Sequence, residues 1–365
     1  MPAYVCKPAL LAALILSASA CGAKSSSTPI DDASLDSSPD RGVPDARPPD
    51  AAAPDAAPMQ PEYAIAQTDT TLRYMTAPPS PLSPTMRELT LRAYYPLEFV
   101  EEAPLIMVSH GGQGSMRGHM AHSHLGSHYA SRGYVAVHIG HRTSTNVASH
   151  RWDRPHDASA TLDAIERGEF SLPADFGGSI RTDEAGHIGH SWGAYTAHAL
   201  AGGRFGSALS DEDYWDFRDE RIVAMAALSP QGPEGFGAYD TEPNWEMESG
   251  DNTWRGITIP TFTLIGEAEM NGVAGIESGM CDECFRAENW RLFPYLRSPS
   301  DGQRYTSIIA GGTHSDLGSG GSVDIKRYLA FNTRIFFDIY LRGDSRERES
   351  LGYAEAVADV DHRQK

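Results

Sequence analysis

A serine between two glycines is the stretch of the sequence whose residue types point most directly to chemistry. Gly189-His190-Ser191-Trp192-Gly193 fits the pattern Gly-x-Ser-x-Gly, follows a short apolar run, and precedes a segment of helical character at residues 195–200. Strand, sharp turn and helix in this order expose a nucleophilic serine. Ser191 would then lie at a helix N-terminus, where free N–H groups favour developing negative charge. The alternative is a glycine-rich turn with a solvated serine.

A nucleophilic serine needs a general base, and in this arrangement the histidine is the last member along the chain. The histidines after Ser191 are His198, His314 and His362. His198 falls inside the helical segment that follows the serine, and His362 falls in a polar terminal segment. His314 follows an apolar run and lies in a loop of small residues. We therefore predict His314 as the base, with a surface loop histidine as the alternative.

The carboxylate that orients the base should follow a strand between the serine and the histidine. The apolar run at residues 257–265 ends in Gly266-Glu267-Ala268-Glu269. We favour Glu269, because a Gly-x-x-acid sequence at a strand end places the carboxylate on the turn. Glu267 remains the alternative for the same role. If neither residue acts, the next candidates in the sequence are Glu234 and Asp240.

An oxyanion hole requires two N–H groups near the nucleophile. One is expected from Trp192, the residue after the serine. The other is expected from the turn His110-Gly111-Gly112-Gln113, which follows the apolar run at residues 104–108. We predict that Gly112 or Gln113 supplies it.

The elements that must position these residues alternate between strand and helix character. This alternation predicts an α/β fold with a mostly parallel central sheet covered by helices on both faces. Ligands on such sheets bind beyond the carboxyl ends of the strands, which is where the chemical residues fall. The expected strands are residues 89–95, 104–108, 134–139, 185–190, 222–228, 257–265 and 305–309, and the main helices are residues 119–132, 155–168 and 322–341.

Residues from about 85 to 345 resemble the α/β-hydrolase superfamily, and within it the platelet-activating-factor acetylhydrolase-like and dienelactone-hydrolase-like serine hydrolases. The matching elements are His110-Gly111-Gly112, Arg154-Pro155-His156-Asp157, the Ser191 motif and Gly312-Thr313-His314. The resemblance implies an α/β-hydrolase fold and ester hydrolysis by a Ser-His-acid triad without metal or cofactor.

The sequence departs from this family pattern in two ways. Dienelactone hydrolases proper use a cysteine nucleophile, whereas this chain has Ser191. In acetylhydrolases of the animal plasma type the acid follows the preceding strand, here residues 222–228, where this chain offers none. The resemblance therefore implies the reaction class and not a lipid substrate.

The first 61 residues differ in composition from the rest of the chain. Residues 1–20 have the charged, apolar and small-residue regions of a signal peptide. Cys21 follows in a context similar to a bacterial lipobox, although Ala18 stands where leucine is usual. We expect an exported, membrane-anchored lipoprotein lipidated at Cys21, with a periplasmic or secreted protein as the alternative. Residues 21–61 are rich in Ala, Ser, Pro and Asp and predict a disordered tether.

The remaining chain is expected to form one hydrolase domain, residues 62–345, and a polar tail, residues 346–365. A net charge of −19 without a basic patch argues against a nucleic-acid partner. In an exported protein, Cys281 and Cys284 predict a disulfide. Four histidines at positions 119, 122, 124 and 128 could suggest a metal, but no acidic residue lies among them. We interpret them as a polar helix face or pocket rim.

The sequence as a whole predicts a serine esterase that acts on a small-molecule or lipid ester through an acyl-enzyme intermediate. A lipase or peptidase on the same scaffold is the first alternative. The second is a non-catalytic surface binding protein that keeps the fold. Intact Ser191 and His314 favour an enzyme.

Overall fold

The computed structural model describes most of the chain after residue 61. The described residues are 62–76, 86–98, 100–112, 117–142, 147–203, 216–230, 254, 256–272, 295, 301–353, 357 and 360–365. The predicted signal peptide, Cys21, the tether, Gln113 and the cysteine pair Cys281 and Cys284 lie outside these residues.

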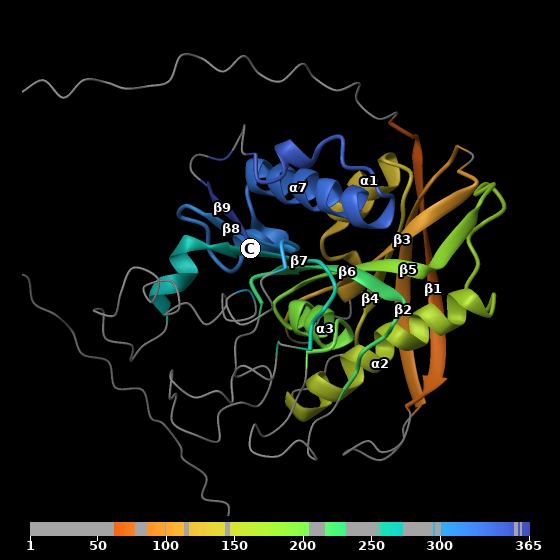
Figure 1. The fold of residues 1–365 in the computed structure, drawn as a ribbon. Helices are drawn as coiled ribbons and strands as arrows, with labels where there is room; N and C mark the ends of the chain where they lie inside the picture. The colour runs from red at the N-terminus through yellow and green to blue at the C-terminus, as the bar shows by residue number, and fades with distance from the viewer. Residues whose placement is uncertain are drawn as a thin grey trace, which may run out of the picture. The chain divides into compact units, whose positions relative to one another are not determined.

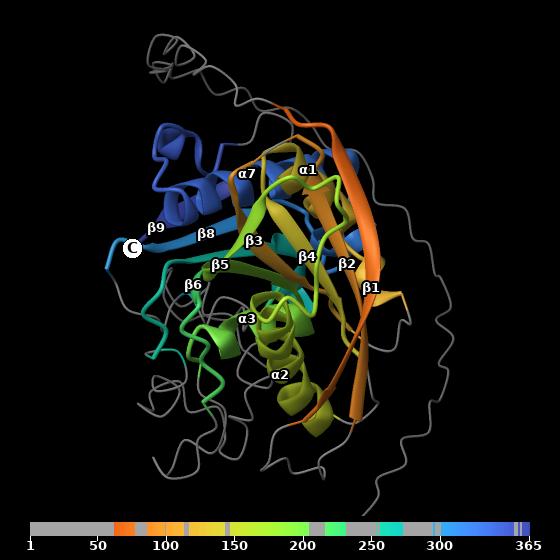
Figure 2. The ribbon, with the colours of Figure 1, turned by 90° about the vertical axis from the view of Figure 1, so that its right-hand side faces the viewer.

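The described strands form one nine-stranded sheet in the order β1-β2-β4-β3-β5-β6-β7-β8-β9. Strands β3 to β8 pair in parallel, whereas β1, β2 and β9 pair antiparallel at the two sides of the sheet. Figure 2 shows β1 at one edge and β8 and β9 at the other. The strands are β1 (Ile65–Met75), β2 (Met86–Pro96), β3 (Glu102–Ser109), β4 (Val135–Gly140), β5 (Ser179–His190), β6 (Ile222–Leu228), β7 (Thr261–Gly266), β8 (Arg304–Ile309) and β9 (Val360–Gln364).

Helices cover both faces of this sheet. Helices α1 (Ser123–Ser131) and α7 (Val323–Leu341) lie on one face, and α2 (Val147–Glu166) and α3 (Trp192–Leu200) lie on the other (Figure 1). Shorter helical turns are η1 (Gly118–Met120), η3 (Glu267–Gly272), η5 (Asp316–Gly320) and η6 (Arg348–Ser350). The predicted α/β class with a mostly parallel sheet flanked by helices is confirmed.

The burial of each strand follows from its place in the sheet. Strands β7 and β8 are buried along their whole length, as expected for short apolar runs between two helical layers. Strand β1 alternates between exposed and half-buried positions at the sheet edge, and its polar sequence gave no strand prediction. Among the described helices, none is long and apolar enough to cross a bilayer.

Two expectations about the elements were wrong. Helix α2 begins at Val147, so Pro155 lies in its interior instead of near its first turn. The helix continues through the proline because Trp152, Ala158 and Leu162 bury its inner face. The predicted polar tail, residues 346–365, contains strand β9 instead, which is polar because it forms a sheet edge. Its His362 lies with Nδ1 2.9 Å from the hydroxyl of Ser307 on β8.

Candidate active site

Ser191 occupies a strained turn between β5 and α3. Its backbone angles are φ 56° and ψ −117°, a conformation that residues other than glycine rarely adopt. Its N–H donates to the carbonyl of Leu228 at 2.9 Å. Strain of this kind costs about 1–3 kcal/mol and persists where the surroundings enforce it. Here the backbone of β5 and that of α3 approach closely, because a Cβ on Gly189 would lie 2.2 Å from the backbone of Gly193. The two glycines of the motif therefore let the strand and helix meet at the serine.

Glu269 is the carboxylate that contacts His314. Its Oε2 lies 2.9 Å from His314 Nδ1, and its side chain is only 2% exposed. Its Oε1 accepts hydrogen bonds from the Ser229 hydroxyl at 2.6 Å and from the Gly266 N–H at 2.9 Å. A carboxylate held in this way accepts a hydrogen bond from Nδ1–H, which leaves Nε2 of His314 as the basic nitrogen.

Glu267, the alternative acid, points elsewhere. Its exposed side chain accepts the N–H of Gly311 at 2.9 Å. The turns after β7 and β8 pack backbone against backbone, since a Cβ on Gly266 would lie 2.1 Å from the carbonyl oxygen of Gly312. This contact brings the acid turn and the histidine loop together.

His190 connects the serine turn to the histidine loop. Its Nε2 lies 2.8 Å from the backbone carbonyl of His314, so this nitrogen carries a proton and donates it. The two imidazole rings are 4.6 Å apart between centroids. Because His190 directly precedes Ser191 in the chain, this contact brings the histidine loop to the serine turn. The sequence analysis assigned His190 no role.

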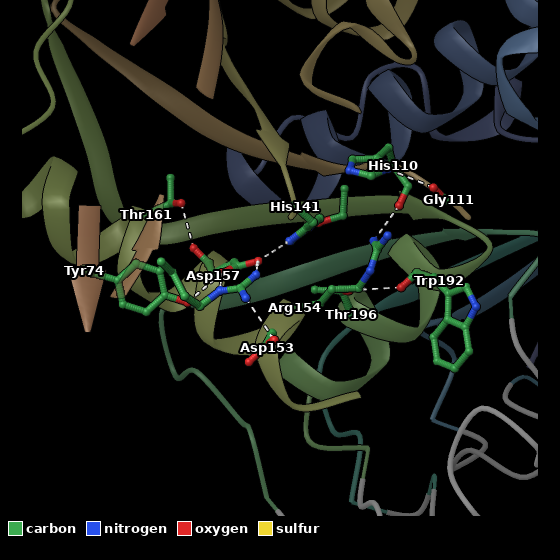
Figure 3. Close-up of polar contacts among 12 residues, drawn as sticks. Tyr74, His110, Gly111, His141, Asp153, Arg154, Asp157, Thr161, Trp192 and Thr196 are labelled. Atoms are coloured by element: carbon green, nitrogen blue, oxygen red, sulfur yellow. Dashed lines mark hydrogen bonds and ion pairs between the residues drawn. The ribbon is translucent and has the colours of Figure 1, made fainter. Parts of the chain in front are cut away.

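The turn after β3 lies against the serine. A Cβ on Gly111 would lie 2.9 Å from Cβ of Ser191. Arg154 on α2 donates to two carbonyls of this turn, that of His110 at 2.7 Å and that of Gly112 at 3.1 Å. Figure 3 shows Arg154 pointing toward the turn that contains His110 and Gly111. Trp192 is the first residue of α3, so its N–H belongs to the helix N-terminus.

A second Ser-His-carboxylate arrangement lies at the ends of β3 and β4. The Ser109 hydroxyl lies 2.8 Å from His141 Nε2, and His141 Nδ1 lies 2.9 Å from Asp157. The Ser109 hydroxyl also lies 3.0 Å from His187 Nε2. These residues are buried, with Ser109 and Asp157 at 0% exposure.

Asp157 is the centre of this buried network. It accepts two hydrogen bonds from Arg87, at 2.6 and 2.8 Å. It accepts a third from the Tyr74 hydroxyl at 2.6 Å (Figure 3). Arg87 also donates to Asp153 at 2.9 Å. In the sequence, Arg154-Pro155-His156-Asp157 stands out only as an element of the family resemblance. The partners of Asp157 on the strands, Tyr74 and Arg87, are distant in the sequence, and Arg87 is 70 positions away. No local sequence pattern therefore indicates these contacts.

Many buried histidines of the described chain are neutral. Burial lowers the pKa of His138, His187 and His198 to about 3, and that of His124 and His128 to about 4. Burial also lowers the pKa of His110 and His122 well below the ordinary value. Within the described part of the chain, no group of three or more His, Cys, Asp or Glu side chains is arranged to hold a metal ion.

The chain was compared with protein-family models and with curated proteins, and neither comparison finds a match.

Proposed function

We propose that this protein is a serine hydrolase with the α/β-hydrolase fold that cleaves carboxylic esters. The observation that carries the proposal is the hydrogen bond between Glu269 and His314, made beside the strained turn of Ser191. The order serine, acid, histidine along the chain and a glycine-rich turn after β3 are both features of this class of enzyme. They support a nucleophile after β5, an acid after β7 and a base after β8.

In the proposed reaction, the Ser191 hydroxyl oxygen attacks the ester carbonyl and His314 Nε2 takes the hydroxyl proton. Glu269 stabilises the imidazolium that forms. The N–H of Trp192 and that of Gly112 or Gln113 stabilise the oxyanion. Collapse of the intermediate releases the alcohol, which takes the proton from His314. Water then attacks the acyl-enzyme by the same steps and releases the acid.

The strained serine argues against a non-catalytic binding protein. Strain that costs about 1–3 kcal/mol occurs at active sites and also at ligand clamps, but only an active site needs the accompanying pair of Glu269 and His314. Lipase and peptidase activities would use the same residues, so a panel of p-nitrophenyl esters of increasing acyl length, with peptide anilides, separates these substrate classes from a short-chain esterase.

The proposal is tested with a fluorophosphonate probe and one ester substrate. We expect the wild-type protein to be labelled and to hydrolyse the ester. Ser191→Ala should abolish labelling and reduce kcat by about a million-fold, because loss of the nucleophile leaves only binding and the oxyanion hole.

Ser109→Ala is the matched control for this experiment. Ser109 also contacts a histidine that contacts a carboxylate, but it is fully buried. The variant should keep both labelling and ester hydrolysis. Labelling that survives Ser191→Ala and disappears in Ser109→Ala would refute the proposed site.

A further inference from the structure

We propose that Arg154 is the positioning residue of the oxyanion hole: it holds the turn after β3 so that the N–H groups of the turn face Ser191. This inference rests on the proposed function, since it assigns how one part of that site is kept in place. Arg154 does not touch the substrate in this proposal and acts only through the backbone that it holds.

Side chains hold the carbonyls of the turn. Arg154 Nη1 donates to the carbonyl of His110 and Nη2 to that of Gly112, while His110 Nδ1 donates to the carbonyl of Gly111 at 2.8 Å. Three consecutive peptide units are therefore fixed by side chains. In a planar trans peptide, the N–H points opposite to the C=O. Holding each carbonyl also sets the direction of the N–H in the same peptide unit.

These peptide units include one predicted oxyanion donor within the described residues. The N–H of Gly112 shares a peptide unit with the carbonyl of Gly111. The carbonyls on either side of that unit, those of His110 and Gly112, are the two that Arg154 holds. The turn also lies directly against the serine, because a Cβ on Gly111 would lie 2.9 Å from Cβ of Ser191.

Arginine suits this role because its planar guanidinium offers several fixed donors, whereas lysine presents a single point charge. Arg154 is 1% exposed. Burial lowers its pKa to about 9 against the opposing effect of Asp157, so the side chain remains charged at neutral pH. A charged donor makes stronger hydrogen bonds to carbonyls than a neutral one.

The position of Arg154 is itself fixed by its neighbours on α2. Asp153 and Asp157 pair with Arg87 on β2 at 2.9 and 2.6 Å. Asp157 also accepts a hydrogen bond from the Tyr74 hydroxyl on β1 (Figure 3). These contacts tie α2 to the sheet on both sides of Arg154 in the sequence. The buried network around Asp157 thus acts as the support on which the oxyanion turn is held.

The test compares Arg154→Gln with Arg304→Gln. Arg304 is a matched control, because it is 0% exposed and its Nη1 and Nη2 also donate to two backbone carbonyls, those of Ile259 and Ile257. It lies at the amino end of β8, opposite to the end that carries His314. Both variants lose a buried arginine that holds backbone, but only one touches the proposed site.

For Arg154→Gln we expect kcat to fall by about 10²–10³-fold, the effect of losing one oxyanion donor, with KM within about threefold of wild type. The affinity for an aryl trifluoromethyl ketone, whose serine adduct carries an oxyanion, should fall in parallel with kcat/KM. Arg304→Gln should lower the unfolding temperature yet keep kcat and ketone affinity within about threefold, since its carbonyls are remote from the serine.

Arg154→Lys keeps the charge and covers the case in which Arg154→Gln does not fold. We expect its kcat to fall at least about tenfold with an unfolding temperature near wild type. Near-wild-type kcat in a folded Arg154 variant, or an equal loss of ketone affinity in Arg304→Gln, would overturn the inference. Wild-type protein that is neither labelled by the fluorophosphonate nor active on any ester would instead refute the proposed function, and this inference with it.

Discussion

Two Ser-His-carboxylate arrangements lie along the same side of the sheet. Ser191, His314 and Glu269 sit on turns beyond β5, β8 and β7, whereas Ser109, His141 and Asp157 connect the ends of β3 and β4 to α2. The distance from histidine Nδ1 to the carboxylate is 2.9 Å in both. The distance from the histidine to its carboxylate therefore does not distinguish them.

The surroundings differ in ways that matter for chemistry. The His314 side chain is 37% exposed, whereas those of His141 and Asp157 are 0% exposed. Ser191 lies at a helix N-terminus in a strained turn, while Ser109 ends a regular strand and contacts two histidines. The negative charge of Asp157 is also compensated by its ion pair with Arg87. A candidate catalytic site is characterised by more than a serine, a histidine and a carboxylate. It also has solvent access to the histidine, backbone strain at the serine and a nearby oxyanion turn.

The largest expected effect concerns the arrangement around His314. Glu269→Gln should lower kcat by about ten-thousand-fold, because the amide no longer fixes the histidine tautomer or stabilises the imidazolium. Glu267→Gln should stay within a few-fold, because Glu267 contacts the N–H of Gly311 and not His314. Both are measured as kcat on one p-nitrophenyl ester. A reversed ranking would move the acid to Glu267.

The buried arrangement should respond mainly in stability. Asp157→Asn leaves the buried guanidinium of Arg87 poorly compensated, and breaking such a pair costs about 3–5 kcal/mol. Asp69→Asn is the control, since Asp69 forms a more exposed pair with Arg92 worth about 1 kcal/mol or less. Urea unfolding gives both values. Equal losses in the two variants would remove the contrast between buried and exposed ion pairs.

A smaller effect is expected in the dependence of stability on pH. His187 has its pKa lowered from 6.5 to about 3 by burial, so between these values the unfolded chain binds a proton that the folded chain does not. The free energy of unfolding then falls as pH falls, by up to about 1.4 kcal/mol per pH unit for this histidine. Above pH 6.5 the contribution vanishes, because both states are neutral.

His187→Gln isolates this contribution from that of the other buried histidines. Glutamine has a side-chain nitrogen that can still reach Ser109 but does not titrate. We expect the free energy of unfolding of the variant to change less steeply between pH 6 and 4.5 than that of the wild type, by roughly 1.4 kcal/mol per pH unit. Parallel curves would mean that His187 gains its proton in the folded state as readily as in the unfolded one.

The sequence alone predicted those features that leave local patterns. Short apolar runs located β3, β4, β6 and β8 to within two residues at each end and the carboxyl ends of β5 and β7, and Gly-x-Ser-x-Gly located the turn of Ser191. The preference for Glu269 rested on the spacing after Gly266, and the structure places that carboxylate at His314.

Contacts between distant segments could not be predicted in this way. Arg87 and Asp157 are separated by 70 positions, and no periodic pattern in the sequence indicates that they pair. Strands β1 and β9 were not predicted. Sheet edges tolerate polar residues, so these sequences lack the apolar pattern of a buried strand. His190 fits the variable position of the serine motif, and only the fold shows that its ring reaches the carbonyl of His314.

The close backbone contacts between turns limit how this protein can evolve. A Cβ on Gly193 would lie 2.0 Å from the carbonyl oxygen of Ser109, and one on Gly266 would lie 2.1 Å from that of Gly312. Even alanine does not fit at either position, so a saturation library at these codons would return almost only inactive clones. Laboratory selection for new substrates would have to draw its variation from side chains around the turns, while the turns themselves stay invariant.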